Sequence, residues 1–136
     1  MVHIMKSKVI TVSIHAAPAA VYAFASNPAN LPQWIPSFVR SVALVNREWV
    51  IQTPLGSATW RFVDKNDFGV LDHIIRLASG LEIYNPMRVV PNGAGSEFEF
   101  MLFQMPDVSD DVYAEDAKAV ESDLRALKDI MESSHV

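Results

Sequence analysis

Six short strand-like runs, separated by turn signals, occupy the middle of the sequence. Their residues are mostly apolar or alternate between apolar and polar, and Gly, Pro, Asn and Asp stand between the runs. Runs this short and this closely spaced predict strands joined by tight turns, and therefore an antiparallel meander. The runs cover residues 38–45, 48–53, 57–64, 70–78, 81–90 and 96–104.

A seventh strand is expected before the meander, over residues 3–15. Ile10, Val12 and Ile14 alternate there with polar residues, which predicts a strand with these three side chains facing the core. The same alternation interrupts the apolar run that a secretory signal peptide would need. No apolar stretch approaches the roughly 18 residues of a membrane span. We therefore predict a cytoplasmic protein.

Two short helices are expected between the first strand and the meander, and prolines mark their limits. Pro18 suits the first turn of a helix over residues 19–26. Asn27-Pro28 ends that helix, because a residue before proline is disfavoured in the helical conformation. A second helical segment follows over residues 29–35.

One long amphipathic helix closes the chain. Ser109 can cap its N-terminus, and nine of the sixteen acidic residues, with three of the eleven basic ones, lie from residue 107 onward. This acidity predicts a solvated helix face rather than an interaction tail, and we expect charge reversal at Asp123, beside the apolar stripe, to matter little. The stripe repeats at spacings of four and three: Tyr113, Ala117, Val120, Leu124, Leu127 and Met131.

Seven strands and one long helix predict a single two-layer α+β domain over residues 1–136, with the helix packed across the sheet. A helix is about 10 Å wide, whereas seven strands spaced about 4.8 Å apart are far wider. The sheet must therefore curl around the helix. A curled sheet leaves room for a cavity near the short helices, which indicates a small-molecule pocket.

The element order and several segments resemble the START-like, or helix-grip, superfamily, and within it the polyketide cyclase/dehydrase-like branch. The segments are VSIHAAP at residues 12–18, Val21-Tyr22, NPANLPQW at residues 27–34 and LRALK at residues 124–128. The resemblance covers essentially the whole chain. It implies a seven-stranded curved antiparallel sheet that grips a long C-terminal helix, with a hydrophobic ligand cavity between them. It implies no single chemistry, since the superfamily includes cyclases, dehydratases, transfer proteins, hormone receptors and chaperone activators.

His73 is the candidate catalytic residue. It shares one face of its strand with Leu71, Ile75 and Leu77, and this more apolar face should point inward. An imidazole on a cavity wall can act as a general acid or base on a carbonyl, or hydrogen-bond a ligand. A purely structural histidine, satisfied by neighbouring protein groups, remains the alternative.

Other candidate ligand-binding residues are large or polar side chains at positions expected to face inward. Methionine suits a deformable pocket as well as a core, and a tryptophan presents an apolar ring with one polar atom. Asn85 is polar in an apolar position, and Asn85-Pro86 is a place where a strand can bulge. The candidates besides His73 are Trp34, Trp60, Asn85, Met87 and Phe100.

Several other sites are not expected. Asp72 and Arg76 fall on the outward strand face, where we expect a surface ion pair. Glu97 and Glu99 should likewise face solvent, which gives a paired-carboxylate glycosidase little support. The chain has no cysteine, and its histidines at positions 3, 15, 73 and 135 lack metal-ligand spacing. We expect neither a metal nor a cofactor.

The sequence therefore predicts a domain that binds a small hydrophobic, lipid- or polyketide-like molecule, with cyclase or dehydratase chemistry left open. The alternative is a non-enzymatic interaction or regulatory module that acts through its surface. The formal net charge of −5 argues against a nucleic-acid partner. The oligomeric state is undetermined, and a homodimer remains open.

Overall fold

The computed structural model describes residues 4–133. The expected beginning of the first strand at residue 3 lies outside the described residues, as do His3 and His135. The strands of the described part are β1 (Ser7–Ile14), β2 (Ser41–Val45), β3 (Glu48–Thr53), β4 (Gly56–Phe62), β5 (His73–Leu77), β6 (Glu82–Asn85), β7 (Met87–Asn92) and β8 (Gly95–Phe103). Its helices are α1 (Pro18–Ala25), the 3-10 turn η1 (Pro28–Asn30), α2 (Leu31–Trp34) and α3 (Asp110–Ser133).

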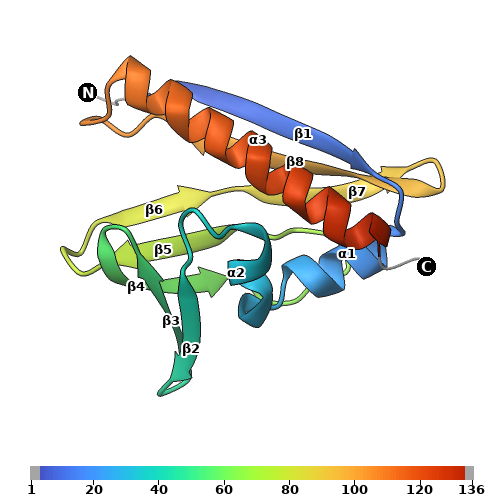
Figure 1. Cartoon of the computed structure of the whole chain (residues 1–136), viewed down its shortest axis with the longest axis horizontal. Coiled ribbons are helices and arrows are strands. Elements are labelled where there is room, and N and C mark those ends of the chain that lie inside the picture. The colour runs from blue at the N-terminus through green and yellow to red at the C-terminus, as the bar shows by residue number, and fades with distance from the viewer. Residues whose placement is uncertain (1–3, 134–136) are drawn as a thin grey trace.

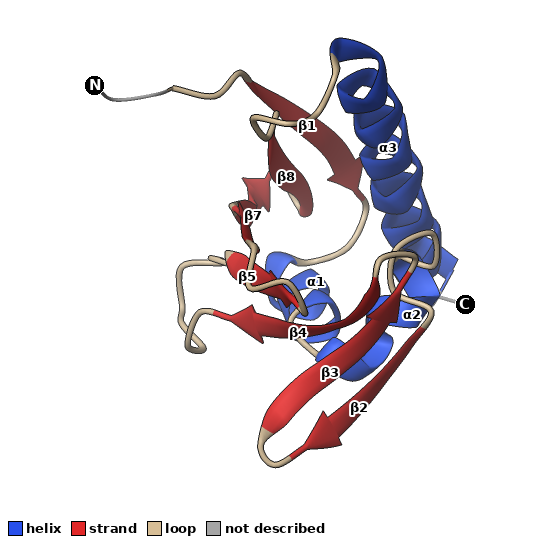
Figure 2. Ribbon diagram, turned by 90° about the vertical axis from the view of Figure 1, so that its left-hand side faces the viewer, coloured by secondary structure: helices blue, strands red, loops and turns tan. Residues whose placement is uncertain are grey.

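The strands form two antiparallel sheets rather than one. One sheet has the order β1-β8-β7, and the other has the order β2-β3-β4-β5-β6. Seen from the side, the strands follow a bent surface, with α1 and α2 inside the bend and α3 along its open side (Figure 2). The α+β class, the element order and the long closing helix are as expected. The single seven-stranded sheet is wrong, because the run at residues 81–90 is two strands.

The break between β6 and β7 falls at Pro86, which has no backbone N–H to give to a sheet. Asn85 still pairs with His73 on β5, whereas Met87 pairs with Phe100 on β8. The strand thus changes partners across one residue, and the sheet divides there.

Asp72 occupies the position opposite this break. Its Oδ1 accepts a hydrogen bond from the backbone N–H of Met87 at 3.0 Å, and its Oδ2 accepts one from the Tyr84 hydroxyl at 2.9 Å. The side chain is buried. The expected surface pair with Arg76 is therefore wrong, because the carboxylate supplies an acceptor to a backbone N–H at the bulge instead.

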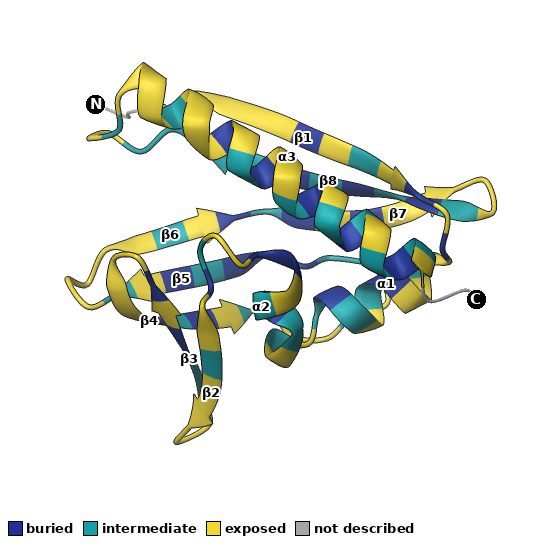
Figure 3. Cartoon of the chain, viewed as in Figure 1, coloured by how far each residue is buried: buried dark blue, intermediate teal, exposed yellow. Residues whose placement is uncertain are grey.

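The long helix α3 lies over β1 and runs diagonally across the molecule (Figure 1). The Ser109 hydroxyl accepts from the Val112 N–H at 3.2 Å, as expected for the cap. The stripe faces the core, and Figure 3 shows its buried residues along one side of the helix. The buried members are Ala117, Val120, Leu124, Leu127 and Met131. No helix within residues 4–133 is long and apolar enough to cross a membrane.

Asp123 corrects the expectation of a simple solvated face. It lies beside Leu124 at the side of α3 that faces the loop after α2. Burial raises the pKa of its carboxyl to about 7, and a hydrogen bond from Ser37 opposes that rise. A charge at this position is costly, so its substitution should not be neutral.

Candidate functional site

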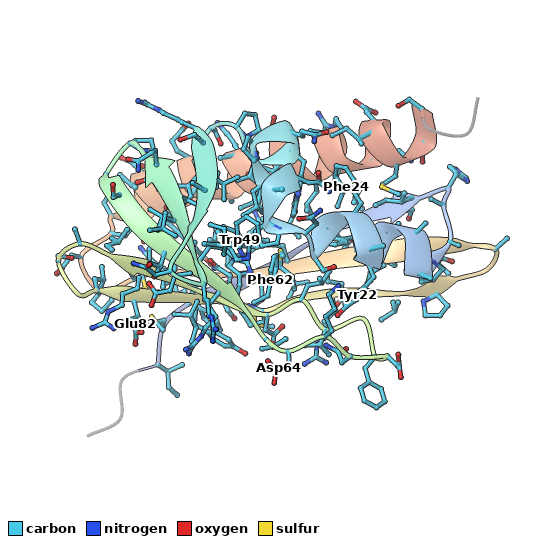
Figure 4. All side chains as sticks on the ribbon, turned by 90° about the horizontal axis from the view of Figure 1, so that it is seen from below. Tyr22, Phe24, Trp49, Phe62, Asp64 and Glu82 are labelled. Atoms are coloured by element: carbon cyan, nitrogen blue, oxygen red, sulfur yellow. The ribbon has the colours of Figure 1, made fainter. Side chains whose placement is uncertain are left out.

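An open hollow of about 690 Å³ lies between α1 and the strands β3 and β4. Its apolar wall contains Trp49, Trp60, Phe62 and Leu71, and α1 contributes Tyr22. Figure 4 shows Trp49 and Phe62 between these strands and the helix. Charged side chains from β3, β4, β5, β6 and the adjoining loops also line the hollow: Arg47, Glu48, Arg61, Lys65, Arg76 and Glu82.

The loop between β4 and β5 holds the side of the hollow next to α1. The Asn66 backbone N–H donates to the Tyr22 hydroxyl oxygen at 3.0 Å, which ties the loop to the helix. The Asn66 side chain also bonds within the loop, donating to the Val70 carbonyl oxygen at 3.0 Å and accepting from its N–H at 3.1 Å. Tyr22 is thus fixed at the hollow by a polar contact, while its ring faces the space.

Trp60 connects this hollow to the buried interior. It lines the hollow, and its ring stacks on the His73 imidazole with a centroid separation of 4.0 Å and an interplanar angle of 11°. Phe62 and Phe100 also lie against the imidazole, with centroids 5.7 and 6.2 Å away. Three aromatic rings therefore enclose His73 inside the protein.

The environment of His73 keeps its ring neutral at pH 7. The residue is 1% exposed, and this burial lowers the pKa of the imidazole from 6.5 to about 4. The Leu71 carbonyl oxygen, 3.3 Å from Nδ1, and the charge of Asp72 both oppose the shift but are outweighed by desolvation. The ring therefore carries one N–H and one lone pair.

Three buried nitrogens have no hydrogen-bond partner among the groups that the structure describes. They are Nε1 of Trp34, Nε1 of Trp60 and Nε2 of His73. Leaving such a group unpaired costs about 1–3 kcal/mol, and the large majority of buried side-chain polar atoms in native proteins have a hydrogen-bond partner. An interior built this way has hydrogen-bonding capacity for a molecule from outside the chain.

The structure brings five of the six expected ligand-binding residues together. Trp60, His73 and Phe100 form a run of ring contacts. Asn85 lies opposite His73 in the strand register, and Met87 lies opposite Phe100. All five are buried, and of these five Trp60 also lines the hollow.

Trp34 is separate from this group. It is fully buried on α2, and its ring meets Phe98 edge-on with a centroid separation of 5.9 Å. It is not among the residues that line the hollow beside α1.

Sequence reasoning missed Trp49, Phe62 and Tyr22 as lining residues. Trp49 pairs directly with Trp60 across β3 and β4, and Phe62 follows Trp60 at the strand period, so the shared face was a usable signal. Tyr22 carried no such signal, since its position depends on the packing of α1 and its bond to Asn66. No group of three or more potential metal ligands occurs within residues 4–133.

Solved structures share this fold over nearly the whole length of this chain. XoxI from Bacillus cereus is 18% identical with a TM-score of 0.75, and the match covers 97% of this chain and 99% of that one. A START superfamily protein from Mycobacterium smegmatis is 15% identical with a TM-score of 0.67, covering 93% and 97%. DynU16, from the dynemicin biosynthetic locus, is 12% identical with a TM-score of 0.71, covering 94% of this chain and 48% of that one.

At these identities the likeness shows the fold alone. No curated protein matches the sequence. The sequence itself matches a family over residues 5–132, which is nearly its full length. The chain belongs to the family described as "Polyketide cyclase / dehydrase and lipid transport", and it shares the fold of the START superfamily protein.

Proposed function

We propose that the protein binds a small, largely apolar molecule, lipid-like or polyketide-like, that enters through the hollow beside α1. One observation carries the proposal. Trp60 lines the hollow and stacks on His73, and each of these two side chains has a buried nitrogen without a partner among the described residues. The family description, which names polyketide cyclases and lipid transport, supports the same class of ligand.

The proposal includes several finer points that the sequence suggested. The molecule is taken up without a metal or cofactor, in the cytoplasm, and the protein does not act on nucleic acid. His73, with Trp60, Asn85, Met87 and Phe100, forms the inner part of the ligand site, and Trp34 bounds it on the side of α2. An acid–base role for His73 toward the bound molecule stays a prediction. Because the pKa of the ring is about 4, the ring is neutral at pH 7. It can therefore accept a proton as a general base, but it is not in the protonated form that a general acid needs.

Tryptophan fluorescence tests the proposal, because Trp49 and Trp60 line the hollow. Titration with apolar aromatics and lipids should give a saturable change in emission. Ala23→Phe should weaken binding at least about tenfold, or about 1.4 kcal/mol, because Ala23 lines the hollow. Ala20→Phe is the matched control, on the exposed surface of the same helix and outside the lining.

No saturable change with any compound would contradict the proposal and favour the alternative, a module that acts through its surface. Equal weakening by the Ala20 and Ala23 variants would place the binding site elsewhere.

A further inference from the structure

We propose that the bound molecule carries a hydroxyl group, as a phenol, enol or alcohol, and that this hydroxyl donates a hydrogen bond to Nε2 of His73. The inference rests on the proposed binding function and narrows its ligand class. It follows from the hydrogen-bond capacity of two buried side chains, His73 and Trp60, and from the orientation of their rings.

The Leu71 carbonyl oxygen determines which ring nitrogen of His73 carries the hydrogen. Nδ1 lies 3.3 Å from the Leu71 carbonyl oxygen, and a carbonyl oxygen can only accept. Nδ1 therefore carries the hydrogen. Because burial also keeps the ring neutral at pH 7, Nε2 holds a lone pair, and this atom can only accept a hydrogen bond.

The groups around the ring do not supply the missing donor. Trp60 has an N–H, but its ring lies parallel to the imidazole at an interplanar angle of 11°. An indole N–H lies in its own ring plane, so it cannot point at an atom of a ring stacked above it. Phe62 and Phe100, the other rings against His73, have no donor. No other described residue donates to Nε2 either, so we infer that its donor comes from a bound molecule.

The chemistry of the incoming group is further limited by Trp60, whose ring lies against the imidazole. The Nε1 atom of Trp60 is a buried donor without an acceptor among the described residues. A hydroxyl is both a donor and an acceptor, so it can serve His73 and Trp60.

An ionised carboxylate would serve only Trp60. It would set lone pairs against the lone pair of Nε2, and the rings that contact His73 offer no cation to pair with its charge. Burial of such an unpaired charge is costly. The structure therefore favours a hydroxyl over a carboxylate at this position.

Three naphthalene derivatives test the inference at pH 7 by fluorescence titration or calorimetry. 2-Naphthol has a donor and an acceptor, 2-methoxynaphthalene has the acceptor alone, and 2-naphthoate is ionised. We expect 2-naphthol to bind about tenfold more tightly than 2-methoxynaphthalene, which is the scale of one buried hydrogen bond, and 2-naphthoate to bind most weakly.

His73→Phe keeps an aromatic ring against Trp60 but removes Nε2, so the preference for 2-naphthol over 2-methoxynaphthalene should fall to about one. His15→Phe is the matched control, because His15 is an exposed histidine outside the lining of the hollow. It should keep the wild-type preference. A preference that survives in His73→Phe would overturn the inference.

Nitrogen-15 NMR of the wild-type protein gives an answer even where the His73 variant fails to fold. The Nε2 resonance should show the unprotonated neutral form, and it should move on addition of 2-naphthol but not of 2-methoxynaphthalene. A resonance that stays unmoved by bound 2-naphthol would overturn the inference. Equal, saturable binding of both compounds would overturn the inference and leave the proposed binding function standing. Absence of saturable binding by all three would overturn the inference, and absence of binding by the lipids as well would overturn the proposed function.

Discussion

Asp123→Asn should stabilise the protein at neutral and alkaline pH. Asp123 lies beside Leu124 on α3, and burial raises the pKa of its carboxyl from 3.8 to about 7. The amide has nearly the same shape and can still accept from the Ser37 hydroxyl. The variant therefore removes the charge and little else.

The pH dependence follows from the pH at which the Asp123 carboxyl loses its proton in the unfolded and in the folded state. The unfolded chain releases it near pH 3.8, whereas the folded protein holds it up to about pH 7. Between these values the folded state binds more protons, so the free energy of unfolding falls as pH rises. A pKa change of this size corresponds to about 4 kcal/mol at full strength, and partial exposure to water reduces it to about 2 kcal/mol.

Urea denaturation of both proteins at intervals from pH 4.5 to pH 8.5 measures this effect. The wild type and Asp123→Asn should be similar near pH 4.5, and the variant should be about 2 kcal/mol more stable above pH 8. Asp129→Asn is the control, since it removes the same charge from an exposed position on the same helix. If the two variants differ from the wild type by the same amount at every pH, the argument from burial is refuted.

Two further predictions concern the core and the break between the sheets. Leu124→Ala should lower the free energy of unfolding by about 2–5 kcal/mol, because Leu124 is 1% exposed. Arg125→Ala, at the exposed neighbouring position, should change it little in the same denaturation assay. Asp72→Ala should cost about 1–3 kcal/mol, because the buried N–H of Met87 loses its acceptor. Arg76→Ala should be nearly neutral by thermal denaturation, and a large loss there would restore the surface ion pair that the sequence predicted.

The elements whose patterns are local were predictable from the sequence. Ile10, Ile14, Trp60 and His73 face inward because strand alternation depends only on neighbours along the chain. The stripe of α3 is buried for the same reason, with the helical period in place of the strand period.

Features that depend on contact with a distant segment of the chain were not predictable in this way. Alternation from Arg76 placed Asp72 on the outer face, but β5 begins at His73, and Asp72 stands at the bulge instead. The burial of Asp123 depends on the loop after α2, and the lining of the hollow depends on the packing of α1 against the strands. Each requires the three-dimensional course of a distant part of the chain.

The buried polar residues Asp72, His73 and Asn85 lie beside the break between β6 and β7, where the sheet divides. In the two residues before His73, the Leu71 N–H donates to the Met87 carbonyl oxygen at 2.8 Å, and Asp72 accepts from the Met87 N–H. Leu71, whose carbonyl oxygen orients the imidazole, is thus held by a backbone hydrogen bond to the strand that follows the break at Pro86. The direction of the Nε2 lone pair is therefore set when the protein folds, and a ligand that uses it need not meet the cost of ordering the ring.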